Sequence, residues 1–170
     1  GPLSLPSAVM RDYLRGRNLV SRRTLASLRD AMSRFEAVTQ SVPDYASGWA
    51  SLAECEMLLA HYGAPDRERL IDDCERHLER ALTLEPDLGI GLSTRGAVRF
   101  FFRRDIDGAA ADLERAQLVA EAENDVGLST HGITRVAERM EVRRRLRWHY
   151  TGAPRSGQIA RAGLLVFSVF

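Results

Sequence analysis

Apolar and small residues along this chain recur at helical spacing rather than in strict alternation. The large residue Trp49 is followed four positions later by Ala53, and Leu92 is followed at the same step by Gly96. Residues four apart lie on one stripe of a helix, and a small residue on that stripe lets a second helix approach closely. The pattern therefore predicts pairs of packed helices, and the fold class that it indicates is all-α.

The helical pattern is also repeated along the chain. The segment 91–96, Gly-Leu-Ser-Thr-Arg-Gly, returns 36 residues later as segment 127–132 with one change. A second set of small or apolar residues stands 12, 8 and 5 positions before three regularly placed residues: Ala31, Phe35 and Val38 before Pro43; Cys74, Leu78 and Ala81 before Pro86; Ala109, Leu113 and Ala116 before Glu121. Recurrence of this kind is typical of helical repeat proteins.

Two prolines mark the ends of these predicted units. Because proline cannot continue a helix interior, Pro43 and Pro86 each indicate the end of a second helix. Asp44 and Asp87 follow them directly and predict side-chain caps for the next helices. Each unit therefore consists of a helix, a turn, a second helix and a turn marked by proline.

These positions resemble the signature of the tetratricopeptide repeat (TPR) family. The central two repeats carry the likeness on Trp49, Leu52, Ala53, Cys74, Leu78, Ala81 and Pro86, and then on Leu92, Gly96, Ala109, Leu113 and Ala116. The sequence departs from the family pattern at Glu56, where an aromatic residue is usual, and at Arg95 and Glu121. Segments 12–17, 22–24 and 43–46 further resemble the TPR regions of bacterial signalling proteins, such as winged-helix regulators and class III adenylate cyclases.

The resemblance implies an α-solenoid, a right-handed superhelical stack of antiparallel helix pairs with three repeats and a degenerate fourth. We expect a repeat domain over residues 5–154, with repeats at about 8–43, 44–86, 87–124 and 125–154. Residues 1–4 are interpreted as a tag scar or linker. Residues 155–170 are oddly apolar for a solenoid end, which needs a polar or covered face. We expect a capping tail that folds back, or a segment that lies in the groove or pairs with another chain.

The distribution of charge limits the partners that we expect. All 24 positive side chains are arginine, with an acidic middle between basic ends: residues 1–35 hold seven arginines and two acidic residues, residues 36–124 nine and 18, and residues 125–170 eight and three. An acidic body disfavours nucleic-acid binding, for which the Arg-rich segment 143–148 is the only candidate. No apolar run is long enough to span a membrane, and two cysteines suit a reducing cytoplasm.

Candidate chemistry is sparse. The sequence has no phosphate-binding loop, dinucleotide fingerprint or nucleophile elbow. Cys55 and Cys74 fall at packing positions, and the four histidines, His61, His77, His131 and His149, lack metal-ligand spacing. The charges over residues 72–80 are interpreted as a solvated helix face with weak ion pairs. We therefore expect no enzyme, no catalytic residue, no metal and no cofactor.

The function implied by the resemblance is recognition of a protein or peptide partner inside a bacterial regulatory or signalling protein. The family's register places these residues on the inner face of the groove: Arg11, Leu14, Asn18, Ala50, Glu54, Met57, Ser93, Ala97, Phe100 and Phe101. Two other hypotheses stay open. One is a small TPR-type secretion chaperone, and the other is an oligomerisation domain that associates with itself through residues 156–170.

Overall fold

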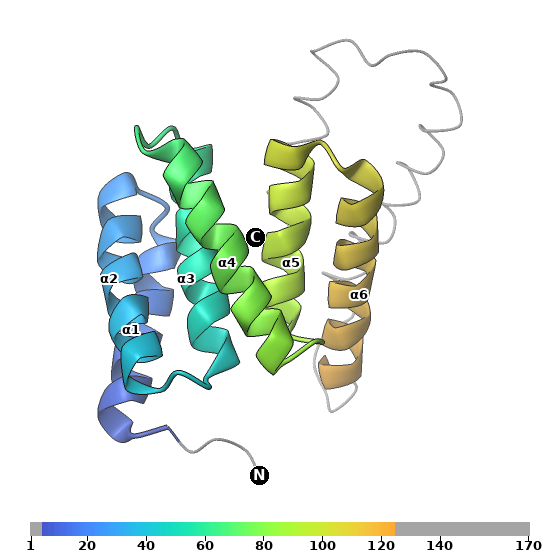
Figure 1. Ribbon diagram of the computed structural model, residues 1–170. Helices are drawn as coiled ribbons and strands as arrows, with labels where there is room; N and C mark the ends of the chain where they lie inside the picture. The colour runs from blue at the N-terminus through green and yellow to red at the C-terminus, as the bar shows by residue number, and fades with distance from the viewer. Residues whose placement is uncertain (1–4, 125–170) are drawn as a thin grey trace, which may run out of the picture.

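The computed structural model describes residues 5–124, and the regular structure within this range is helical throughout. The elements are α1 (Ser7–Ser21), α2 (Leu25–Ser41), α3 (Ala46–His61), α4 (Arg67–Leu84), α5 (Gly89–Val98), the π-helical turn η1 (Arg99–Arg103) and α6 (Ile106–Asn124) (Figure 1). The predicted helical class is confirmed for these residues. The expected fourth repeat and the tail at 155–170 lie outside the described residues.

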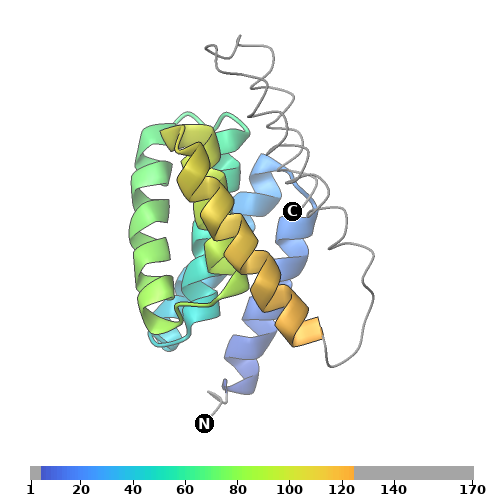
Figure 2. The same ribbon diagram turned by 90° about the vertical axis from the view of Figure 1, so that its right-hand side faces the viewer.

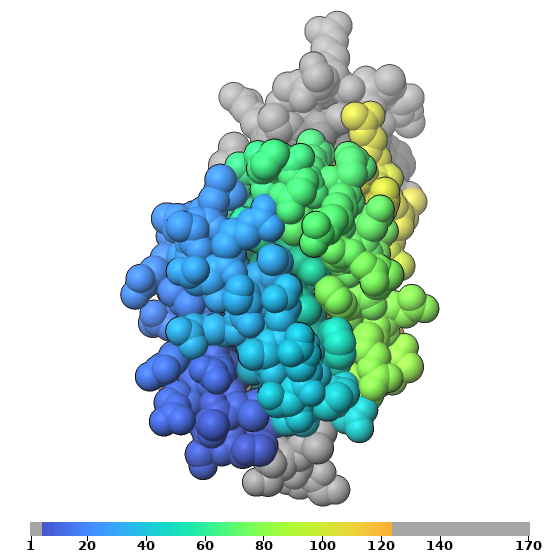
Figure 3. All heavy atoms as spheres, turned by 60° about the vertical axis from the view of Figure 1, so that its left-hand side comes forward, coloured from blue at the N-terminus to red at the C-terminus, as the bar shows by residue number. Residues whose placement is uncertain are grey.

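The helices form three antiparallel pairs in chain order: α1 with α2, α3 with α4, and α5 with α6 (Figure 1). Neighbouring pairs meet where α2 packs on α3 and where α3 packs on α5. Figure 2 looks onto α6, at the opposite end of the row from α1. On the side seen in Figure 3, the blue surface of α1 and α2 adjoins the green surface of α4.

Helix α3 is the centre of the packing. It contacts α2, α4 and α5, and its residues from Gly48 to Ala60 are buried apart from Trp49, which is half-buried. A helix that is buried on nearly every side needs such surroundings, and its buried polar side chains need partners on the neighbouring helices. Its Met57 and Leu58 join Phe35, Leu28 and Leu78 of neighbouring helices in one core cluster.

Small residues on the first helix of each pair lie against the second helix. A Cβ atom added to Gly16 would lie 2.7 Å from the Phe35 ring, and one added to Gly96 would lie 2.9 Å from Leu113 Cγ. In the middle pair, the Cys74 thiol donates a hydrogen bond of 3.2 Å to the Ala53 carbonyl. The close approach predicted from the spacing of small residues is therefore present in each of these pairs.

The second helices end where the prolines predict, but the prediction that aspartates cap the next helices is wrong. Helices α2 and α4 end just before Pro43 and Pro86, whereas α3 and α5 begin without a side-chain cap. Asp44 accepts a hydrogen bond of 3.0 Å from Arg80, and Asp87 accepts one of 2.6 Å from Arg115. The N-cap positions of α3 and α5 are Tyr45 and Leu88, so each aspartate stands one residue before the position from which it could cap the helix.

Candidate functional site

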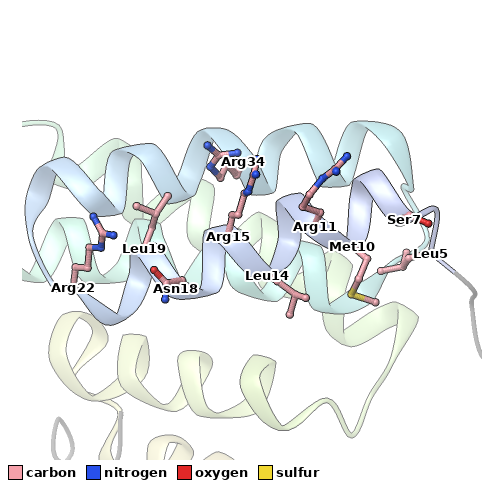
Figure 4. Close-up of a pocket in the computed structure, with 10 residues that line it drawn as sticks. All are labelled: Leu5, Ser7, Met10, Arg11, Leu14, Arg15, Asn18, Leu19, Arg22 and Arg34. Carbon is pink, nitrogen blue, oxygen red and sulfur yellow. The ribbon is translucent and has the colours of Figure 1, made fainter.

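An open hollow of about 720 Å³ runs along the outer side of α1 (Figure 4). Residues of α1, its preceding segment and α2 line it: Leu5, Ser7, Met10, Arg11, Leu14, Arg15, Asn18, Leu19, Arg22 and Arg34. Two large apolar side chains remain open to solvent there, because Leu14 is 58% exposed and Met10 is 39% exposed. The hollow therefore combines apolar surface with four arginines.

Three of the four arginines of the hollow lie close together, and Arg22 lies apart from them at the end of α1 (Figure 4). In Figure 4, Arg11 and Arg15 lie on the side of α1 that faces Arg34 of α2, whereas Met10 and Leu14 lie on the other side. Arg34 donates a hydrogen bond of 3.1 Å from Nη1 to Asp12. Among residues 5–124 no acidic side chain pairs with the other three arginines of the hollow, Arg11, Arg15 and Arg22.

The inner-groove residues predicted on the first helix meet in this hollow. Arg11, Leu14 and Asn18 all line it, and all three are exposed. Spacings of three and four residues place them along one stripe of α1. They lie on the first helix only and share this hollow with none of the groove residues predicted on α3 or α5.

The inner-groove residues predicted on α3 are buried instead. Ala50 and Met57 have no exposed surface, and Glu54 is 3% exposed. The carboxylate of Glu54 pairs with the guanidinium of Arg17 on α1. These three side chains offer no surface to a partner in this conformation, because α3 is packed against α2, α4 and α5.

The inner-groove residues predicted on α5 and η1 differ in how far they are buried. Ala97 is fully buried, whereas Ser93, Phe100 and Phe101 are half-buried. Phe101 packs against the core cluster, and its ring centroid lies 4.7 Å from that of His61. The π-helical turn η1 carries the two phenylalanines. These residues do not share the α1 hollow with Arg11, Leu14 and Asn18.

Ion pairs between helices were missed by the sequence analysis. Asp112 of α6, which is 4% exposed, accepts hydrogen bonds from Arg95 at 2.6 and 2.9 Å and from Arg99 at 2.7 Å. Glu75 of α4 likewise binds Arg103 through two hydrogen bonds of 2.6 and 2.7 Å. The available signal was a lone acidic residue at a helix-packing position, because a buried charge needs a partner. These pairs join helices and serve packing.

A second buried pair joins α3 to α4. Glu56 Oε2 and His77 Nδ1 lie 2.9 Å apart in a hydrogen bond, and the Glu56 side chain is 5% exposed. Burial raises the pKa of Glu56, and the hydrogen bond to His77 opposes that rise. Glu56 stands where the TPR pattern usually has an aromatic residue. The imidazole of His77 is half-buried, and its ring centroid lies 5.4 Å from that of Trp49.

The two cysteines are placed for packing. Both are buried, and burial raises the pKa of each thiol well above its ordinary value. A protonated thiol is a poor nucleophile and a poor metal ligand. Within residues 5–124 no three histidine, cysteine or acidic residues gather as a metal site would require, and no helix of this range is long and apolar enough to cross a membrane.

Comparison with protein-family models, curated proteins and solved structures gives no match for this chain. The nucleic-acid candidate at 143–148 and the self-association candidate at 156–170 lie outside the described residues. The α1 hollow is therefore the candidate site that the described structure supports best.

Proposed function

We propose that this chain is a non-enzymatic binding module of the TPR type, which recognises a protein or peptide partner. Three antiparallel helix pairs in chain order support the repeat architecture. So does the recurring contact of a small residue on each first helix with the second helix, at Gly16, Ala53 and Gly96. Stacked helix pairs of this kind bind partners by shape and surface chemistry.

The observation that carries the binding proposal is the α1 hollow. Exposed apolar surface that is rimmed by polar side chains is typical of protein–protein interaction sites. Leu14 and Met10 offer apolar anchoring surface, and the neighbouring arginines offer polar contacts. Both kinds of contact are used in peptide recognition. The buried polar groups named above are engaged in packing between helices and are not part of this candidate surface.

A binding screen tests this proposal. Residues 1–170 are exposed to a displayed library of bacterial peptides and to a library of folded bacterial domains, and binders are measured by calorimetry. We expect saturable one-to-one binders with Kd values of about 1–100 µM, the range of transient recognition. If neither library yields a saturable binder, the proposed function is wrong.

We further propose that the module belongs to a larger bacterial regulatory or signalling protein. The support is the resemblance of segments 12–17, 22–24 and 43–46 to TPR regions of such proteins. Sequencing the flanking gene tests the setting, and a winged-helix or cyclase domain in the same reading frame is the expected result. A reading frame that encodes this chain alone contradicts the setting without affecting the binding proposal.

A further inference from the structure

We propose that the α1 hollow binds an acidic amphipathic peptide, with apolar residues on one face and glutamate or aspartate beside them. This inference rests on the proposed function and adds the chemistry of the partner and the place where it docks.

Leu14 and Met10 provide the exposed apolar surface of the hollow. They are four residues apart on α1, so they form a short apolar ridge on one side of the hollow (Figure 4). Leu19, which is half-buried, continues the apolar lining toward the end of the helix. A partner helix that presents leucines at steps of three and four would cover such a ridge.

Arg11, Arg15 and Arg22 provide positive charge along the hollow. Arg11 and Arg15 lie four residues apart on α1, Arg22 directly follows its last residue, and none of the three has an acidic partner within residues 5–124. A guanidinium group binds a carboxylate through two parallel hydrogen bonds, as Arg95 and Arg103 do elsewhere in this structure. Carboxylates on the polar flank of a partner would therefore meet matched donors in the hollow.

Other occupants fit the hollow less well. The chain's own residues 125–170 carry eight arginines against three acidic residues, so they would place like charges beside the arginines of the hollow. A nucleic acid would meet aliphatic rather than aromatic side chains in the hollow, and the acidic body at 36–124 would repel its phosphates. A second copy could offer acidic surface, and the experiment distinguishes this case.

The probe is a synthetic peptide of about 16 residues, with leucines along one helical face and glutamates elsewhere. Its matched controls are a peptide of the same composition with scattered leucines and a peptide with glutamine in place of glutamate. Calorimetry with residues 1–170 should give a Kd on the order of 10 µM for the probe, and at least tenfold weaker binding for each control. Raising the salt concentration should weaken binding of the acidic probe.

Two variants of the hollow test the place of binding. The double variant Arg11→Gln/Arg15→Gln should lower affinity for the probe on the order of tenfold and flatten its salt dependence, because charge-assisted hydrogen bonds are lost. Leu14→Ser should lower affinity about fivefold or more through lost apolar contact. The matched controls are Arg69→Gln on α4 and Leu118→Ser on α6, whose side chains are exposed elsewhere and should leave affinity unchanged.

Each other outcome overturns the inference. Equal binding of the probe to wild type and to both hollow variants places the peptide elsewhere. No binding of the probe, while the library screen yields other binders, refutes the acidic partner but leaves the proposed function standing. Tighter binding of a single-stranded DNA that Arg11→Gln/Arg15→Gln abolishes assigns the hollow to nucleic acid. A molar mass that rises with concentration in wild type, but not in that double variant, assigns it to a second copy.

Discussion

The guanidinium of Arg17 on α1 pairs with the carboxylate of Glu54 on α3, although these two helices make little other contact. Glu54 is the more buried partner, with a side chain that is 5% exposed against 35% for Arg17. Burial lowers the pKa of Arg17, but the attraction and hydrogen bond of Glu54 outweigh that effect and raise it overall. The pair thus ties the first helix to the central one.

Removal of the arginine should destabilise the fold, because it leaves a buried carboxylate without a partner. We expect Arg17→Met to lower the free energy of unfolding by about 2–3 kcal/mol, below the full range for deeply buried pairs since Arg17 is partly exposed. Urea denaturation followed by circular dichroism measures the loss. Arg15→Met, two positions away on the exposed side of α1, should change stability by less than about 0.5 kcal/mol.

The double variant Arg17→Met/Glu54→Gln separates charge from packing. It should recover much of the stability lost in Arg17→Met, because the unpaired charge is then gone. If the single variant is no less stable than Arg15→Met, the ion pair contributes nothing to the fold.

Close packing at Gly96 gives a second prediction. A Cβ atom there would lie 2.9 Å from Leu113 Cγ and 3.3 Å from the Ala109 carbonyl oxygen, so α5 and α6 would have to separate. Gly96→Ala should therefore lower the free energy of unfolding by about 1–3 kcal/mol. Gly89→Ala is the control on the same helix, since its Cβ would have only Val119 Cγ1 nearby, at 4.0 Å.

The control substitution should leave stability unchanged or raise it by up to about 1 kcal/mol, because alanine restricts the unfolded chain more than glycine does. Thermal denaturation of both variants gives the comparison. Equal effects of the two substitutions would show that helix propensity, rather than the approach of α6, governs these positions.

The sequence predicted contacts within helix pairs better than contacts between them. The spacing of Gly96 and Leu113 is set by two neighbouring helices and a short turn, so local periodicity is enough to find the contact. Arg17 and Glu54 are 37 residues apart, and their meeting depends on how one helix pair is rotated against the next. Periodicity within a helix carries no information on that rotation.

The same limit explains the mixed result for the candidate site. Arg11 and Leu14 lie on the first helix of the row, and both side chains are exposed. Ala50 and Met57 lie on the central helix, which is covered by α2, α4 and α5. The partners of Asp44 and Asp87 could not be predicted either. Each carboxylate binds an arginine that is distant in sequence and comes close only in the folded chain.

The buried thiols lead to a third prediction. Cys55 and Cys74 have no exposed surface, and burial raises their pKa values well above the ordinary one. At pH 8 a disulfide reagent should therefore react with the folded protein on the order of a thousandfold more slowly than with protein unfolded in guanidinium. Cys74→Ala and Cys55→Ala, measured separately, assign the slow phases. Fast reaction of either thiol in the folded protein would contradict its burial.

The fourth prediction concerns pH and the buried carboxylate of Glu56. Because burial raises its pKa above the ordinary 4.5, the folded state binds this proton more tightly than the unfolded state does. The resulting contribution to stability is complete below pH 4.5 and is lost as the pH rises through the folded pKa. Asp73 and Glu36 also favour the protonated form, whereas His77 opposes it. Glu56→Gln, which cannot ionise, should therefore gain stability relative to wild type as the pH rises.

A carboxylate with the opposite shift provides the control for that experiment. Hydrogen bonds from Arg103 lower the pKa of Glu75, so its contribution is present above pH 4.5 and is lost as the pH falls through the folded pKa. Denaturation curves at a series of pH values should thus show Glu75→Gln losing stability relative to wild type as the pH rises, while Glu56→Gln gains it. If the stability of Glu56→Gln relative to wild type did not change with pH, Glu56 would be ionised as readily in the folded chain as in the unfolded one, with the contact to His77 fully offsetting its burial.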